Sequence, residues 1–61
     1  MNKRDLAISI ARVAGYHDDK ARFTRLVVEA RVARKHLDDA WRIGVQQKRN
    51  GMPCTCARCA A

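Results

Sequence analysis

The stretch FTRLVVEARVARKHLDDAWRIG, residues 23–44, decides the fold of this chain. Apolar and small residues recur in it at alternating spacings of three and four, the period of a coiled-coil seam. It contains no proline, and its only glycine is its last residue. The pattern therefore predicts one long amphipathic helix. The seam positions are Phe23, Leu26, Ala30, Ala33, Leu37, Ala40 and Gly44.

Signals on both sides of this stretch set the limits of the long helix. Asp18 and Asp19 place carboxylates in a first turn, where they complement the helix dipole. Asn50 and Gly51, followed closely by a proline, are strong stop signals. We therefore expect this helix over residues 18–49, with a length of roughly 45 Å at about 1.5 Å per residue.

A shorter helix, roughly 18 Å long, is expected before it over residues 3–14. Asn2 can cap its free amides, and Gly15 is expected to end it because glycine accepts the left-handed conformation. The fold class is thus all-α: a helical hairpin over residues 1–50, followed by a cysteine-bearing tail over residues 51–61. The predicted intrachain core consists of Leu6, Ile10, Val13, Phe23, Leu26, Val27 and Ala30.

The unequal lengths of the two helices predict an oligomer. The short helix, folded back antiparallel, covers only the first half of the long one. Each large apolar side chain left bare on the distal half forfeits about 1.5–3 kcal/mol. A homodimer through the long helix is favoured over cover by a host partner or by the folded-back tail. The predicted dimer interface consists of Leu37, Ala40, Trp41, Gly44 and Val45.

The charge of the chain indicates an acidic partner. Thirteen Lys and Arg residues face six Asp and Glu residues, a net charge of +7. Such a balance is typical of proteins that bind nucleic acid or an acidic protein surface, and arginine contacts both phosphates and carboxylates. The three aromatic residues are too few for a base-stacking platform. We expect an acidic protein surface, with nucleic acid as the alternative. The predicted partner-binding residues are Arg31, Arg34, Lys35 and Arg42.

The size and motifs of the chain do not favour an enzyme or a specific DNA reader. A chain of 61 residues has little room for a deep pocket, and it lacks a phosphate-binding glycine loop and a serine–histidine pair. Ala11 and Gly15 have the spacing seen at a helix-turn-helix turn. That motif needs a short second helix covered by a third, whereas this pattern predicts a long second helix and no third.

The three cysteines Cys54, Cys56 and Cys59 lie together in the tail. Thiolates at this spacing suit zinc, but zinc takes four ligands, and no fourth is near in sequence. A reduced tail without metal is favoured, so that no cofactor is expected; zinc shared within a dimer and a redox role are the alternatives. The apolar segment 6–14 is too short and too charged for a signal sequence or a membrane span, which indicates a cytoplasmic protein.

The stretch IARVAGYH at residues 10–17, the order of a short and then a long helix, and the cysteine-bearing end give the chain a familiar form. In these features it resembles the small early-region proteins of Mu-like transposable phages, among them inhibitors of the anti-quorum-sensing type. Such proteins commonly bind and inhibit host proteins during takeover. The resemblance implies a non-enzymatic protein of the host cytoplasm that binds a host protein such as a transcriptional regulator.

Overall fold

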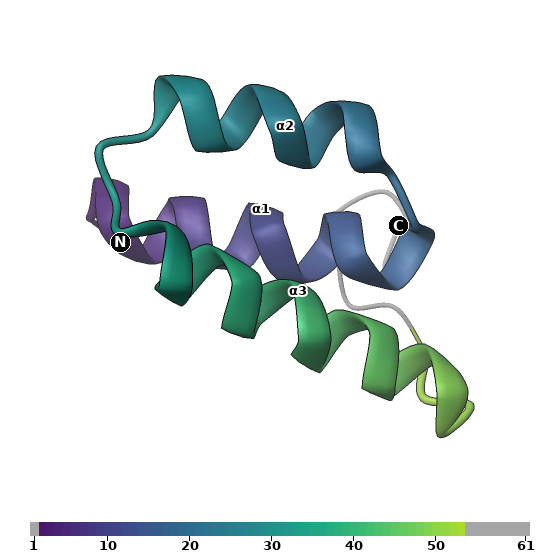
Figure 1. Ribbon diagram of the computed structural model, residues 1–61. Coiled ribbons are helices and arrows are strands. Elements are labelled where there is room, and N and C mark those ends of the chain that lie inside the picture. The colour runs from purple at the N-terminus through teal and green to yellow at the C-terminus, as the bar shows by residue number, and fades with distance from the viewer. Residues whose placement is uncertain (1, 54–61) are drawn as a thin grey trace.

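The computed structural model of the chain describes residues 2–53, which form three helices and no strand. These are α1 (Lys3–His17), α2 (Lys20–Glu29) and α3 (Arg34–Arg49). In Figure 1, α1 lies between the other two, with α2 along one side and α3 along the other. The chain reverses direction after α1 and again after α2, so α3 runs roughly parallel to α1. The predicted all-α class is confirmed.

Helix α1 begins where the sequence predicts and ends later. The Asn2 side chain accepts a hydrogen bond from the Asp5 amide at 2.8 Å, which caps the helix. The helix continues through Gly15 to His17, and Asp18 then adopts the left-handed conformation with φ 55°. The prediction that Gly15 ends the helix is therefore wrong. Gly15 lies inside the helix, where its missing side chain leaves room for α3.

The predicted continuous helix over residues 18–49 is also wrong, because residues 30–33 leave the helical conformation. Ala30 and Ala33 are extended, with ψ angles of 135° and 131°. No proline or glycine occurs in this segment. The cause is therefore not local: the break turns α3 back so that its apolar face reaches α1. Tertiary contacts override a local helix preference here.

A seam of small residues joins α1 and α3. We call it the small-residue seam, and it consists of Ala7, Ala11, Ala14 and Gly15 of α1 with Leu37, Ala40 and Gly44 of α3, all buried. The two backbones come very close along it. A methyl group added at Gly44 would meet the carbonyl oxygen of Arg12 and lie 2.7 Å from the amide nitrogen of Tyr16. One added at Gly15 would lie 2.9 Å from the carbonyl carbon of Trp41.

The residues predicted to form a dimer interface are covered within a single chain. Leu37 is 0% exposed, Ala40 and Gly44 are buried, and Trp41 and Val45 are half-buried. The prediction that α1 cannot reach Leu37 and Trp41 is wrong, because it assumed that α1 packs antiparallel on an unbroken helix. After the break, α1 of 15 residues lies beside α3 of 16 residues, so their lengths match.

The predicted intrachain core is half right. Phe23, Leu26, Val27 and Ala30 pack against the buried cluster, as the sequence predicts. On α1 the prediction misses the main contact: Leu6 is 50% exposed, and Ile10 and Val13 are partly buried but do not belong to the buried cluster. The physical reason is the close approach of α3, which on the α1 side leaves room only for alanine and glycine. The buried residues of α1 are Ala7, Ala11, Ala14 and Gly15.

Because of the close approach at Gly44, we expect a Gly→Ala substitution there to destabilise the protein, the reverse of its usual effect in a helix. In an exposed helix, Gly→Ala stabilises by about 1 kcal/mol. Because the new methyl group would meet the backbone of α1, we expect Gly44→Ala to lower the free energy of unfolding by about 1–3 kcal/mol. Urea denaturation followed by circular dichroism measures the change. Lys48→Ala, an exposed substitution on the same helix, is the control and should change it little. A Gly44→Ala variant more stable than the wild type would contradict the seam.

Candidate functional site

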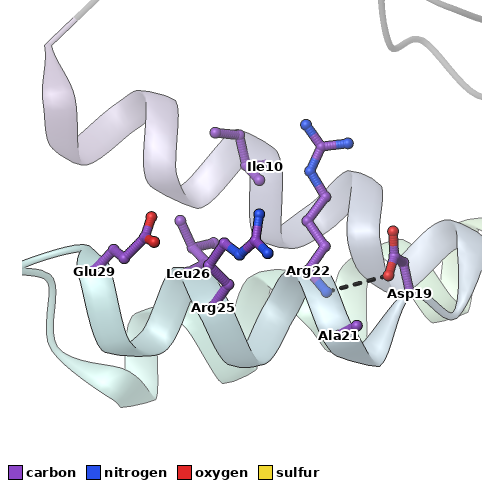
Figure 2. A pocket seen from close by; sticks show the side chains of 7 residues that line it. All are labelled: Ile10, Asp19, Ala21, Arg22, Arg25, Leu26 and Glu29. Atoms are coloured by element: carbon purple, nitrogen blue, oxygen red, sulfur yellow. Dashed lines mark hydrogen bonds between the residues drawn. The ribbon is translucent and has the colours of Figure 1, made fainter.

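A groove lies between α1 and α2, away from the small-residue seam. Its volume is about 500 Å³. Ile10 lines it from α1, and the remaining residues come from α2 and its cap, as Figure 2 shows. We call it the α1–α2 groove, and its lining consists of Ile10, Asp19, Ala21, Arg22, Arg25, Leu26 and Glu29. It contains both charged and aliphatic side chains, a composition suited to binding a ligand of mixed character.

The turn between α1 and α2 positions the groove. The Asp19 amide donates a hydrogen bond to the carbonyl oxygen of Ala14 at 2.9 Å, which ties the start of α2 to the end of α1. The Asp19 carboxylate accepts a hydrogen bond from the Arg22 amide at 3.1 Å and so caps α2. Arg22, Leu26 and Glu29 then follow at spacings of four and three, which places them on one side of the helix.

The groove has an aliphatic floor and a basic rim. Ile10 and Leu26 are partly buried and form the floor from the two helices. Arg22 and Arg25 are exposed, and Figure 2 shows both side chains extending from α2 toward the α1 side of the groove. Glu29 stands at the far end of the same helix. A ligand in the groove would therefore meet guanidinium groups beside an apolar surface.

The two groove arginines form no ion pair with any residue of the described part of the chain. Within residues 2–53 the one ion pair joins Arg34 Nε and Asp38 Oδ2 at 3.7 Å, and it is exposed. The groove carboxylate nearest in sequence, that of Asp19, is already used to cap α2. The guanidinium donors of Arg22 and Arg25 are thus available to a carboxylate or phosphate, which arginine contacts in bidentate fashion.

The predicted partner-binding residues lie elsewhere. Arg31, Arg34, Lys35 and Arg42 are all exposed, as a basic outer surface requires, but none of them lines the α1–α2 groove. Arg34 is engaged with Asp38. The sequence did not single out the groove arginines, although a capping aspartate followed by a regular stripe was a usable signal. The stripe lines a groove only because α2 ends at Glu29 and packs on α1.

Exposed apolar residues adjoin the groove. Val28 is 79% exposed and lies three residues after Arg25, which makes the two neighbours on the surface of α2. Leu6, half-exposed, lies four residues before Ile10 on α1 and is its neighbour in the same way. Arginine is among the residues enriched in protein–protein interfaces, and exposed apolar patches often mark such sites. This surface therefore suits a protein partner.

The aromatic side chains of residues 2–53 make contacts within the chain that stabilise its fold. The rings of Phe23 and Trp41 lie 4.9 Å apart and join α2 to α3. The Tyr16 hydroxyl donates a hydrogen bond to the carbonyl oxygen of Met52 at 2.6 Å, which holds the segment after α3 against the end of α1. Rings engaged in this way do not form an open platform on which bases could stack.

The predicted zinc ligands Cys54, Cys56 and Cys59 lie outside the described residues, so that prediction stays untested. Within residues 2–53, no group of three or more His, Cys, Asp or Glu side chains is placed to hold a metal ion. The same residues include no helix with the length and apolar character needed to cross a bilayer.

Comparison with known proteins gives no relative: no protein-family model, curated protein or solved structure matches this chain. The resemblance to early phage proteins rests on sequence form alone. The geometry and charge of the α1–α2 groove therefore carry the inference of function.

The capping role of Asp19 gives a prediction for the groove wall. We expect Asp19→Ala to lower the free energy of unfolding by about 0.5–2 kcal/mol, because the Arg22 amide loses its acceptor. Asp19→Asn is the matched control, since asparagine caps a helix about as well as aspartate. Thermal unfolding of both variants by circular dichroism makes the comparison. Equal loss in both variants would show that the charge of Asp19, and not its cap, stabilises α2.

Proposed function

We propose that this chain is a small non-enzymatic interaction protein that binds an acidic, partly apolar segment of another protein in the α1–α2 groove. The observation that carries the proposal is the pair Arg22 and Arg25, without ion-pair partners in the described chain, above the floor of Ile10 and Leu26. Bidentate contacts from arginine fix the orientation of a carboxylate. The floor covers an apolar side chain of the same segment.

The net charge supports this choice of partner. A charge of +7 attracts an acidic surface and speeds encounter with it. The exposed cations outside the groove, such as Arg31, Lys35 and Arg42, contribute to that attraction without forming a site of their own. These cations therefore speed the encounter with the partner, whereas the groove determines which partner binds.

The lining of the groove favours binding over catalysis. Its carboxylates are Asp19, which caps α2, and Glu29 at the far end, and the rest of its lining is arginine and aliphatic. No lining residue is a serine, cysteine, histidine or lysine that could serve as a nucleophile. By the resemblance to early phage proteins, the partner would be a host protein such as a transcriptional regulator, bound and inhibited in the host cytoplasm.

The groove arginines provide the decisive test. We expect the double variant Arg22→Ala/Arg25→Ala to bind its partner at least about 100-fold more weakly, because hydrogen bonds to charged groups contribute about 1.5–3 kcal/mol each and about 1.4 kcal/mol is a tenfold change in affinity. The matched control Arg42→Ala/Arg49→Ala removes the same charge from exposed positions on α3 and should weaken binding much less.

The measurement has two stages. Tagged wild type and both double variants are used as baits in a bacterial host lysate, and retained proteins are quantified by mass spectrometry. A protein retained by the wild type and by the α3 variant, but lost with the groove variant, is then purified and titrated against all three by calorimetry. Equal affinity of the two double variants would show that binding depends on net charge and not on the groove, which would contradict the proposal.

A nucleic-acid-binding function is the second candidate, and one observation favours it. The chain has a third helix and α2 spans 10 residues, as a helix-turn-helix requires, although α3 packs on α1 and leaves no residue of α2 buried. Lys20, Arg22 and Arg25 on α2 are exposed and could contact phosphates. Against it stand the exposed Val28 beside these arginines and the inward use of the aromatic rings.

A gel-shift experiment separates the two candidates. With the groove as a protein-binding site, we expect no retardation of duplex DNA at low salt when scrambled duplex is present as competitor. A nucleic-acid-binding regulator would instead retard the duplex, and its affinity would fall steeply with salt, with a logarithmic slope of about −0.9 for each phosphate contacted. Such a slope, unchanged in the Arg42→Ala/Arg49→Ala variant, would favour the second candidate.

A further inference from the structure

The segment between α2 and α3 contains no residue that requires a helix to end. It reads Ala30, Arg31, Val32 and Ala33, and alanine and arginine are among the strongest helix formers. Asn2 and Asp19 cap α1 and α2, whereas the N-cap position of α3 is Ala33, and no described side chain caps that helix. The break therefore depends on the contacts that α3 makes with α1.

The charged residues on both sides of the break destabilise the helix ends that the break creates. Arg34 and Lys35 stand at the positive end of the α3 dipole, and Glu29 stands at the negative end of the α2 dipole. In one continuous helix these residues would lie in the interior, away from both ends. The first amides of α3 would then donate to the carbonyl groups of the preceding turn, which are left without helical partners at the break.

The contacts of the three helices are unequal. The buried cluster of Ala7, Ala11, Leu37 and Ala40 joins α1 to α3, whereas none of the residues Lys20–Glu29 is buried. Losing the α1–α3 contact would therefore cost more free energy than changing the backbone conformation of residues 30–33. A second copy of the chain can supply the same α1 surface to α3.

We propose that two copies of this chain exchange α3, with α2 and α3 of each copy joined in one helix over residues 20–49. That helix is about 45 Å long and carries α3 away from its own α1. Each α3 then packs on α1 of the other copy and rebuilds the small-residue seam between chains. This is domain swapping, which reuses contacts already present in the monomer. The equilibrium depends on protein concentration, because two chains must meet.

The exchange is independent of the proposed groove function. Every residue that lines the α1–α2 groove precedes the break, from Ile10 to Glu29. A swapped dimer therefore keeps the groove residues of each copy on one chain, and failure of either proposal leaves the other standing.

Ala33→Pro is the variant that distinguishes the two states. Ala33 has φ −56° and ψ 131°, which proline adopts readily, and its amide donates no hydrogen bond within the described residues, so the monomer tolerates the change. In a continuous helix, proline at this position removes a backbone hydrogen bond and clashes with the preceding turn in both copies. We expect the dissociation constant of the dimer to rise by about 100-fold or more.

The experiment refolds the full chain from denaturant at high concentration under reducing conditions and measures mass by light scattering after size-exclusion chromatography. The wild type should give a species of twice the 6.9 kDa chain mass, and Ala33→Pro a monomer with native helix content by circular dichroism. Ala33→Ser, which adds a cap to α3, should also lower the dimer fraction. Its matched control Ala21→Ser lies in a helix in both states and should not change it.

Two results would overturn the exchange. One is a wild type that remains monomeric at every concentration after refolding. The other is a dimer that forms equally well with proline or serine at position 33, since a side-by-side dimer would not depend on helix continuity through residues 30–33. If Ala33→Pro fails to fold, the comparison of Ala33→Ser with Ala21→Ser decides.

Discussion

The close approach of α1 and α3 is the constraint on which the rest of this structure depends. Among residues 2–53, Leu37 is the largest fully buried side chain, so the core is built mainly from alanine, glycine and backbone. Such a core stabilises only when two helices lie nearly in contact, because dispersion falls steeply with distance. Gly15 and Gly44 permit that distance, and both meet backbone atoms of the facing helix.

The other features follow from this contact. If α3 is to run beside α1 in the same direction, an intervening segment must carry the chain back, and α2 does so. Because the strongest contact is already made, α2 packs less closely and leaves the α1–α2 groove at its side. Of the bulky residues excluded from the seam, Ile10 forms part of the floor of that groove, and Leu6 lies half-exposed one turn before it. The core and the candidate site are thus two consequences of one arrangement.

The candidate site was only partly predictable. The sequence correctly indicated exposed basic residues, and Arg31, Lys35 and Arg42 are exposed. It did not indicate which arginines share a site with apolar residues. Arg22 and Arg25 become neighbours of Ile10 only through the turn after α1, which brings residues from two helices together. Charge is a property of composition, whereas a groove is a property of how helices meet.

The sequence by itself determined the helical class, the start of α1 at its Asn2 cap, the end of α3 at Arg49, and the presence of a small-residue stripe that needs a close neighbour. These depend on residues within a turn or two of one another. Only the tertiary structure decided that this neighbour is α1 and that the helix breaks at residues 30–33. Helix propensity is summed locally, whereas the contact that stabilises the break joins residues about thirty positions apart, such as Ala11 and Ala40. No local pattern contains that contact, so no local pattern could show the break.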